Sequence, residues 1–224
     1  MFSVFDQAGR CRHRSALRGK LWKKSVLLNW QFVPGYRNGV APFGVWSVSQ
    51  ASVLTAYLDG TDPCAQSGLV CQDDVAVLAL KRQGGINLGT HTGWYGVGWN
   101  GDGFTGSGVT QITQIGYTTC LDNGKFMERN DSFGFTSASQ SNNTIIGSPM
   151  CEGSSGGPWL VNFGRQPALT GTNAGSASAS NTVVGVTGWG YASTNPKEMG
   201  ASPFLSGNIA ALINAQCAAT PEKC

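Results

Sequence analysis

The sequence has few charged residues and only two histidines, and these scarcities limit what the protein can do. Charged residues make up 12% of the chain and hydrophobic residues 41%, a balance that excludes a disordered protein. No apolar run approaches the roughly 20 residues that span a bilayer. No Cys-x-x-Cys pair or Cys/His cluster is present, so we expect no metal and no cofactor. The 32 glycines and the many short apolar runs predict an all-β protein.

Basic residues are concentrated at the N-terminus. Residues 1–24 hold seven of the 15 Lys and Arg residues and one of the 12 Asp and Glu residues. The other 200 residues therefore carry eight basic and eleven acidic side chains, a net charge of −3. A basic arm can bind nucleic acid or an anionic membrane. The rest of the chain has no basic stripe and no familiar nucleic-acid motif, so we expect neither partner.

The cysteines indicate a disulfide framework. Without Cys11, six remain, and they fall into pairs that frame loops. The preferred pairs are Cys64–Cys71, Cys120–Cys151 and Cys217–Cys224, although six cysteines allow many other pairings. Disulfides form in oxidising compartments, so we expect a secreted protein. A secreted chain should begin with a signal peptide, and residues 1–24 contain neither its apolar core nor its small-residue cleavage site.

Short strand-like runs separated by turn residues continue from Ser25 onward. The predicted strands cover residues 25–33, 45–58 (one strand or a bent pair), 74–80, 111–119, 144–147, 158–163 and 182–190. One helix is predicted over residues 202–217, where apolar residues share a face. Many short strands and one terminal helix predict a barrel or a sandwich.

The stretch MCEGSSGGPWL (150–160) carries the clearest chemical signal. A serine hydroxyl such as that of Ser155 is a poor nucleophile until a neighbouring base removes its proton. The surrounding glycines permit a tight turn, in which the amides of Gly153 and Ser155 can point at one developing oxyanion. A plain Ser/Gly surface loop would have the same composition, so these residues alone leave both interpretations open.

Three motifs in order resemble one enzyme family. The stretches FVPGYRNGVAPFG (32–44), DDVAVLAL (73–80) and CEGSSGGPWL (151–160) resemble the chymotrypsin-like serine endopeptidases, in particular their bacterial glutamyl-endopeptidase-like branch. VTGWG (186–190) follows as it does in that family. The resemblance covers roughly residues 29–216. It implies a chymotrypsin-like double β-barrel with a C-terminal helix, acting as a monomer on peptide or protein substrates.

The resemblance divides the chain and assigns roles to its residues. Residues 25–105 would form a truncated N-terminal barrel, and residues 106–224 the C-terminal barrel and helix. Ser155 would be the nucleophile, with an oxyanion hole made by the Gly153 and Ser155 amides. Asp74 would orient the catalytic imidazole, with Asp73 as its rival. The substrate groove would be lined by the Gly-Trp-Gly stretch, Gly188, Trp189 and Gly190.

Three departures from the family pattern limit the expected specificity. Ser154 stands where many relatives have the aspartate that pairs with a newly cut N-terminus, so we expect no activation by that ion pair. Pro149, six residues before Ser155, stands where trypsin-type enzymes have the aspartate that recognises Lys or Arg. No histidine lies near Val186 or Thr187, where some Glu-specific relatives have one.

The catalytic histidine is missing from its expected place. The family order is His, Asp, Ser, and the histidine motif lies upstream of FVPGY. His91 follows Asp74, so we expect it to be an ordinary loop histidine. VLTA in residues 53–56 resembles the start of the motif, but it follows FVPGY, and Tyr57 is a poor base near neutral pH. His13 has the right order but lies among arginines, which disfavour its cationic form.

A frame error would explain the N-terminal anomalies together. Residues 12–19 (RHRSALRG) can be encoded as CGT CAC CGC AGC GCA CTG CGT G, and one base later this string spells Val-Thr-Ala-Ala-His-Cys-Val. We hypothesise that residues 1–24 are out of frame and that the true frame resumes between Gly19 and Asn29. The chain as written would then be an inactive serine endopeptidase. The alternatives are a catalytically dead homologue that binds peptides or a partner, and a secreted β-sandwich binding module.

Overall fold

The computed structural model describes residues 29–64, 70–164, 174–191 and 197–224. The segment predicted to be out of frame, with Cys11 and His13, lies outside the described residues. So do residues 25–28 of the predicted strand 25–33, of which the structure describes residues 29–33.

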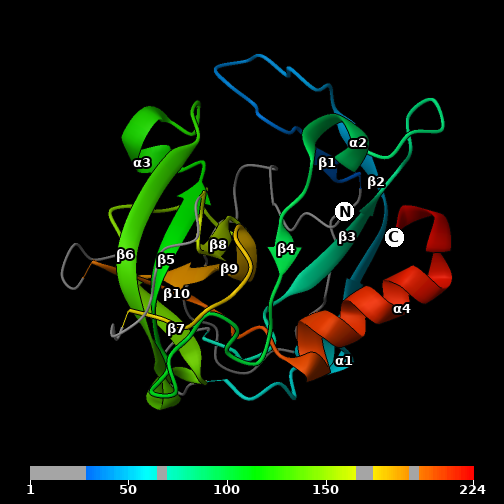
Figure 1. The fold of residues 1–224 in the computed structure, drawn as a ribbon. Coiled ribbons are helices and arrows are strands. Elements are labelled where there is room, and N and C mark those ends of the chain that lie inside the picture. Colours follow the sequence, from blue (N-terminus) through cyan, green and yellow to red (C-terminus); the bar gives the residue numbers. More distant parts are fainter. Residues whose placement is uncertain (1–28, 65–69, 165–173, 192–196) are drawn as a thin grey trace.

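Strands dominate the described fold and form two sheets (Figure 1). The smaller sheet has three antiparallel strands: β1 (Gln31–Phe32), β2 (Trp46–Val53) and β3 (Ala76–Leu80). Strand β3 is the predicted apolar run, and four of its five residues are buried. Trp46, Leu80 and Leu88 form the core on this side of the molecule. This sheet does not close on itself within the described residues, so the first barrel is incomplete, as predicted.

The larger sheet closes into a barrel. Its strands are β4 (Gly96–Val97), β5 (Val109–Gly116), β6 (Glu128–Ser137), β7 (Asn143–Gly147), β8 (Pro158–Val161), β9 (Thr182–Gly190) and β10 (Glu198–Ala201). Six of them run in the order β10-β7-β6-β5-β8-β9, and the β10–β9 pairing closes the ring. Strand β4 adds a short parallel pairing to β9. Trp159, Ile112, Ile146 and Met150 fill the barrel interior.

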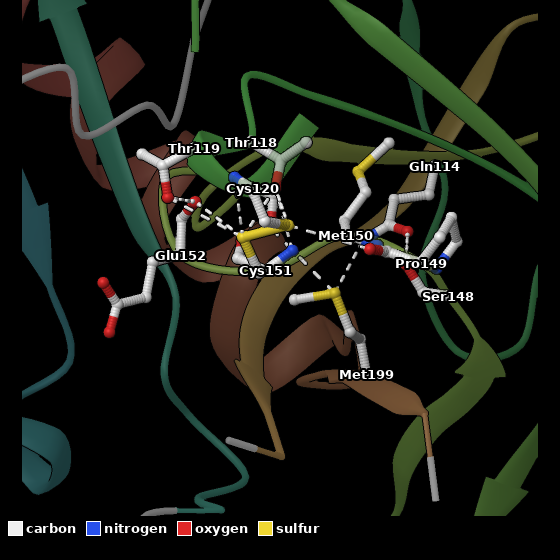
Figure 2. The surroundings of a disulfide bond; sticks show 11 residues. Gln114, Thr118, Thr119, Cys120, Ser148, Pro149, Met150, Cys151, Glu152 and Met199 are labelled. Carbon is white, nitrogen blue, oxygen red and sulfur yellow. Dashed lines mark hydrogen bonds between the residues drawn. A yellow bond between two sulfur atoms is a disulfide. The ribbon is translucent and has the colours of Figure 1, made fainter. Parts of the chain in front are cut away.

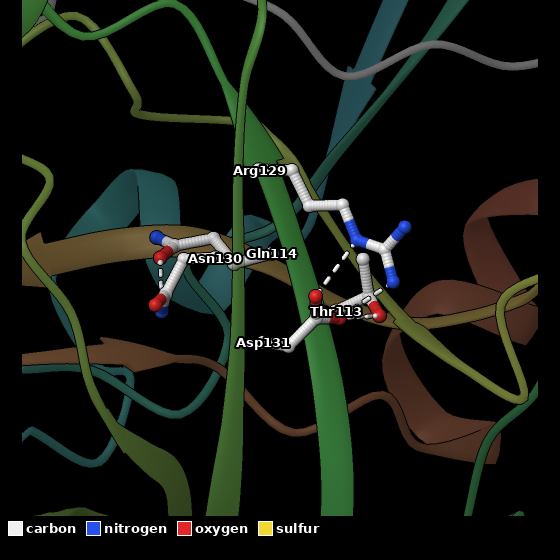
Figure 3. A network of polar contacts seen from close by, with 5 residues as sticks. All are labelled: Thr113, Gln114, Arg129, Asn130 and Asp131. Carbon is white, nitrogen blue, oxygen red and sulfur yellow. Dashed lines mark hydrogen bonds and ion pairs between the residues drawn. The ribbon is translucent and has the colours of Figure 1, made fainter.

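Polar cross-strand pairs hold β6 against β5 (Figure 3). The Thr113 hydroxyl donates to Asp131, which stands opposite it and also pairs with Arg129 at 2.8 Å. On the neighbouring positions, Asn130 donates to Gln114 at 3.4 Å. The sequence analysis missed β6 because its residues are mostly polar and its pairing partner lies elsewhere in the chain. It also missed β10, which has only four residues.

A third apolar cluster joins the two sheets to the C-terminal helix. Val75 and Val77 from the β3 segment pack with Val186 of β9 and with Ile209 and Leu212. The helical elements are α1 (Thr55–Asp59), α2 (Gly89–Thr92), α3 (Thr119–Asp122), η1 (Ala138–Gln140), η2 (Ser206–Ala210), α4 (Ala211–Ala219) and η3 (Pro221–Lys223). The predicted helix is therefore confirmed, although it begins at the π-helical η2. None of the helices in the described part of the chain is long and apolar enough to cross a membrane.

The prediction for residues 45–58 is correct only in its first half. Strand β2 ends at Val53, and the chain turns into α1 from Thr55. Gly60 ends α1 in the left-handed conformation, at a φ of +78°. The alternation of apolar and other residues extends beyond the strand because Leu54, Ala56 and Leu58 continue it into α1.

Three disulfides join the cysteines of the described residues, and they are the pairs preferred from the sequence: Cys64–Cys71, Cys120–Cys151 and Cys217–Cys224. Cys120–Cys151 closes the longest loop, with a sequence separation of 31, against 7 for Cys217–Cys224. A longer closed loop removes more entropy from the unfolded chain.

We expect the double substitution Cys120→Ser/Cys151→Ser to lower the free energy of unfolding by about 3–4 kcal/mol. The matched control, Cys217→Ser/Cys224→Ser, removes the disulfide that closes a shorter loop. It should lower the free energy of unfolding by about 2 kcal/mol. Urea denaturation of both variants measures the difference. Equal losses, or a larger loss in the control, would contradict the prediction.

Candidate active site

Ser155 lies in the loop that joins β7 to β8. The Ser155 side chain is exposed, whereas Ser154 and Gly157 beside it are buried. Gly153 and Gly156 adopt left-handed backbone conformations, with φ of +91° and +74°. The loop therefore makes two sharp turns, one on each side of the 154–155 pair, and presents the Ser155 hydroxyl outward.

Glycine is required at two positions of this loop by close backbone contacts. A Cβ on Gly153 would lie 2.5 Å from the Tyr117 carbonyl oxygen. A Cβ on Gly157 would overlap the Ile115 carbonyl oxygen and lie 2.8 Å from that of Ser154. Because these neighbours are backbone atoms, they cannot move aside as a flexible side chain could.

We expect Gly157→Ala to lower the free energy of unfolding by about 1–3 kcal/mol, because the added methyl overpacks this site. Gly147→Ala is the matched control, since its Cβ would meet only the Ser132 hydroxyl at 3.6 Å, an ordinary contact. Thermal unfolding compares the two. A Gly157→Ala protein as stable as Gly147→Ala would show that the loop is not packed in this way.

Some backbone amides of the loop donate hydrogen bonds within the protein, and two do not. The Ser154, Gly156 and Gly157 amides donate to the carbonyls of Cys151, Thr187 and Ser154 at 3.3, 2.8 and 2.9 Å. The Gly153 and Ser155 amides, by contrast, donate no hydrogen bond to any residue that the structure describes. Two unpaired N–H groups on either side of Ser154, beside an exposed hydroxyl, can stabilise an oxyanion that forms there.

The Cys120–Cys151 disulfide anchors the segment that leads into this loop (Figure 2). The Thr118 hydroxyl accepts a hydrogen bond from the Cys151 amide at 2.9 Å. The Thr119 amide and hydroxyl both donate to the Glu152 carbonyl, at 2.8 and 3.0 Å. The residues just before Gly153 are thus fixed to the segment that follows β5.

Ser154 has a local role in the loop. Its side chain is buried, and its hydroxyl donates to the Cys151 carbonyl at 2.7 Å. The hydroxyl therefore closes the turn in front of Ser155. Pro149 lies at the start of the same loop, where its carbonyl oxygen is 3.8 Å from the Cys120 sulfur of the disulfide.

Asp74 lies two residues before β3, in a largely desolvated position. Burial raises the pKa of the Asp74 carboxyl, a hydrogen bond from the Tyr57 side chain lowers it, and the charge of Asp62 raises it. A Cβ on Gly188 would lie 3.4 Å from Asp74 Oδ2, so the carboxylate borders β9 directly. Its rival Asp73 faces another way: Asp73 Oδ1 accepts a hydrogen bond from Asn208 at 3.1 Å.

One short stretch of β9 connects Asp74 to the Ser155 loop. The Thr187 carbonyl accepts the Gly156 amide at 2.8 Å, and the Thr187 amide donates to the Gly157 carbonyl at 2.9 Å. The next residue, Gly188, borders Asp74. Two consecutive residues of β9 thus contact the two parts of the predicted site: Thr187 binds the loop that follows Ser155, and Gly188 borders Asp74.

The Gly-Trp-Gly stretch forms the end of β9 and has one open edge. Trp189 and Gly190 pair with Gly200 and Met199 of β10. Strand β8 pairs with β9 only up to Val186, so no described strand covers the other edge of residues 188–190. Trp189 is fixed by a hydrogen bond to Asn143 at 3.0 Å. An extended peptide could add to this edge as a further strand.

Of the two histidines, the described residues include only His91. It lies in α2, its side chain is exposed, and its ring packs near that of Trp46 with the centroids 6.0 Å apart. Its surface position agrees with the prediction, but it lies in a short helix rather than in a loop. No histidine is found beside Asp74 in the described part of the chain.

Sequence reasoning missed two residues that affect the pKa of Asp74. Tyr57, which donates a hydrogen bond, was set aside because it follows FVPGY in the chain, and Asp62, which acts through its charge, was not considered. Asp62 is 7% exposed and stands two residues before Cys64. The disulfide framework was the available signal, because the Cys64–Cys71 bridge brings the residues on its two sides together.

The closed barrel, the partial second sheet and the C-terminal helix define the fold of the chymotrypsin-like serine proteases. Protease Anisep from Arthrobacter nicotinovorans matches 85% of this chain and 75% of its own, with a TM-score of 0.65 and 25% identity. A thermostable serine protease, AL20, from an extremophilic microorganism matches 86% and 76%, with a TM-score of 0.61 and 20% identity. A Glu endopeptidase matches 85% and 72%, at 0.55 and 18%.

These bacterial serine proteases confirm the family resemblance that the three motifs predicted. Neither a protein-family model nor the sequence of a curated protein matches the chain. The likeness to known proteins is therefore carried by the fold.

Proposed function

We propose that this fold serves a serine endopeptidase that cleaves peptide bonds through an acyl-enzyme on Ser155. The observation that carries the proposal is the pair of unpaired amides, Gly153 and Ser155, beside an exposed serine hydroxyl. A Ser/Gly surface loop needs no such pattern, and its glycines would not be required by close backbone contacts. The serine protease structures that share the fold support the same activity.

Each group has a role in the proposed reaction. The imidazole of the restored histidine takes the Ser155 proton and becomes the imidazolium while the Ser155 oxygen attacks the peptide carbonyl, and the Gly153 and Ser155 amides stabilise the tetrahedral oxyanion. The leaving amine departs with a proton from the imidazolium, and water then releases the acyl group. Asp74 orients the imidazole, and the substrate backbone pairs with the open edge of the Gly-Trp-Gly stretch, Gly188, Trp189 and Gly190.

The chain as written has no histidine in the family's motif, and we propose that a frame error removed it. The shifted reading of the codons for residues 12–19 would restore Val-Thr-Ala-Ala-His-Cys-Val ahead of FVPGY. Without the base, loss of an essential triad member lowers kcat on the order of 10⁶-fold. We therefore expect the chain as written to be inactive. The three disulfides support a secreted protein.

A fluorophosphonate probe tests the proposal, because it reacts with a serine only when a base activates the hydroxyl. The frame-restored protein is the product of the same gene read in the shifted frame through the histidine motif and returned to the present frame before Asn29. We expect it to be labelled at Ser155, at least about 10³-fold faster than the chain as written. No labelling of a folded frame-restored protein would contradict the proposal.

A peptide-binding homologue without activity is the second candidate. The open edge of residues 188–190 favours it, because a strand can add there whether or not Ser155 is activated. This candidate predicts that the upstream frame holds no histidine motif. It also predicts that extended peptides bind the chain as written, and that a proline at the pairing position of the peptide abolishes binding.

A further inference from the structure

The backbone carbonyl that precedes the Gly153 amide accepts two hydrogen bonds from one threonine (Figure 2). The Thr119 amide donates to the Glu152 carbonyl oxygen at 2.8 Å, and the Thr119 hydroxyl donates to the same oxygen at 3.0 Å. A Cβ added to Gly153 would lie 3.1 Å from the Thr119 methyl carbon. Thr119 therefore lies against both residues that share the Glu152–Gly153 peptide group.

The geometry of this peptide group links the Thr119 contacts to the oxyanion hole. In a trans peptide the C=O and N–H groups lie in one plane and point in opposite directions. A Glu152 carbonyl that is held toward Thr119 therefore directs the Gly153 N–H away from Thr119. This amide donates to none of the residues that the structure describes, so it can bind an oxyanion.

The reverse orientation of the same peptide would remove one donor from the oxyanion hole. Gly153 has a φ of +91° and no side chain, so its backbone has the freedom that such a rotation needs. After the rotation, the Glu152 carbonyl oxygen would point to the side on which the oxyanion forms, and its partial negative charge would repel the oxyanion. The two Thr119 hydrogen bonds oppose this rotation, because both would be lost.

The chain on either side of Thr119 is anchored to the residue before Glu152. The Thr118 hydroxyl accepts a hydrogen bond from the Cys151 amide at 2.9 Å. On the other side, Cys120 forms the disulfide with Cys151. The Thr119 side chain itself is exposed, so its hydroxyl can be removed without opening a cavity in the core.

We infer that Thr119 is a positioning residue for the oxyanion hole: its hydroxyl and amide hold the Glu152–Gly153 peptide in the orientation that leaves the Gly153 N–H to the oxyanion. The inference rests on the proposed function, because it assigns Thr119 a part in the same site. Thr119 acts through the Glu152 carbonyl and touches neither the substrate nor the reacting atoms.

The first test measures the direction of the Gly153 N–H bond by residual dipolar couplings of the ¹⁵N-labelled chain as written. Thr119→Val removes the hydroxyl but keeps the shape of the side chain, and it should shift the Gly153 coupling. Thr119→Ser keeps the donor and should retain the coupling of the unmodified chain. Thr220→Val is the matched control: the Thr220 hydroxyl also donates to a backbone carbonyl at 3.0 Å, that of Gln216 at the end of α4, and its loss should leave the Gly153 coupling unchanged.

The second test measures kcat and KM of the frame-restored protein. Loss of a whole oxyanion donor lowers kcat by about 10²–10³-fold. Thr119→Val keeps the hydrogen bond from the Thr119 amide, so we expect a smaller loss of kcat, about tenfold. KM should change by less than about twofold, because the Gly153 amide stabilises the transition state rather than the bound substrate. Thr119→Ser should restore kcat.

An unchanged Gly153 coupling in Thr119→Val, or equal changes in Thr119→Val and Thr220→Val, would overturn the inference. An unchanged kcat of Thr119→Val in an active frame-restored protein would do the same. If Thr119→Val does not fold, the unmodified chain decides: a scalar coupling across the hydrogen bond should join the Thr119 nitrogen to the Glu152 carbonyl carbon, and its absence would overturn the inference. The coupling measurements do not use Ser155 reactivity, so failure of the proposed function would leave them interpretable.

Discussion

Ser155→Ala should lower kcat of the frame-restored protein for a peptide substrate by about 10⁶-fold. The Ser155 oxygen is the atom that forms the acyl-enzyme, and no other exposed serine among the described residues stands beside the unpaired Gly153 and Ser155 amides. The oxyanion hole alone would leave a residual acceleration of about 10³–10⁴ over the reaction in water. Active-site titration and steady-state hydrolysis measure the loss.

Ser154→Ala is the control for this experiment, because it removes the neighbouring hydroxyl. The Ser154 hydroxyl donates to the Cys151 carbonyl inside the loop and does not reach the solvent. We expect this variant to keep kcat within about tenfold, since it loses one ordinary hydrogen bond. A protein that survives Ser155→Ala but is inactivated by Ser154→Ala would refute the assignment of the nucleophile.

Asp74→Asn should lower kcat of the frame-restored protein by about 10⁴-fold, because an amide favours the wrong tautomer of the imidazole. Asp74 borders Gly188, and the preceding residue, Thr187, is hydrogen-bonded to the Ser155 loop. Asp74 is thus placed to reach an imidazole at that loop. The pH profile of kcat separates this effect from a loss of folding.

Asp73→Asn is the matched control for Asp74→Asn. The Asp73 carboxylate accepts a hydrogen bond from Asn208, and its amide binds Asp62. We expect a change in kcat below about tenfold from the loss of one such contact. Equal effects at the two positions, or a larger effect at Asp73, would show that the carboxylates have been assigned in the wrong order.

The sequence predicted best those elements whose own residues are mostly apolar. Strand β3 and the barrel strands β8 and β9 are mostly apolar runs, and the motif around Ser155 is read from adjacent positions. Strand β6 is different, because its stability comes from cross-strand pairs such as Thr113 with Asp131. Such pairs depend on which strand lies beside β6, and the local sequence of β6 does not show this.

The same limit applies to the candidate site. Ser155 and Asp74 were found from short motifs, whereas the hydrogen bond that lowers the pKa of the Asp74 carboxyl comes from Tyr57 in α1. Between these residues the chain turns at Gly60, and the Asp73 amide donates a hydrogen bond to Asp62. Neither feature is visible in the spacing of residues 57 and 74. Chain order argued against Tyr57 as the base and said nothing about whether it lies near Asp74.

The most direct test of the central claim is a fresh DNA sequence from a few hundred bases upstream through the codon for Asn29. The account predicts that the shifted frame spells Thr-Ala-Ala-His-Cys at the codons for residues 12–19 and continues upstream into a signal peptide. A shifted frame that is interrupted by stop codons, or that lacks the histidine codon, would contradict the claim. The protein would then be a peptide-binding homologue built on a protease fold.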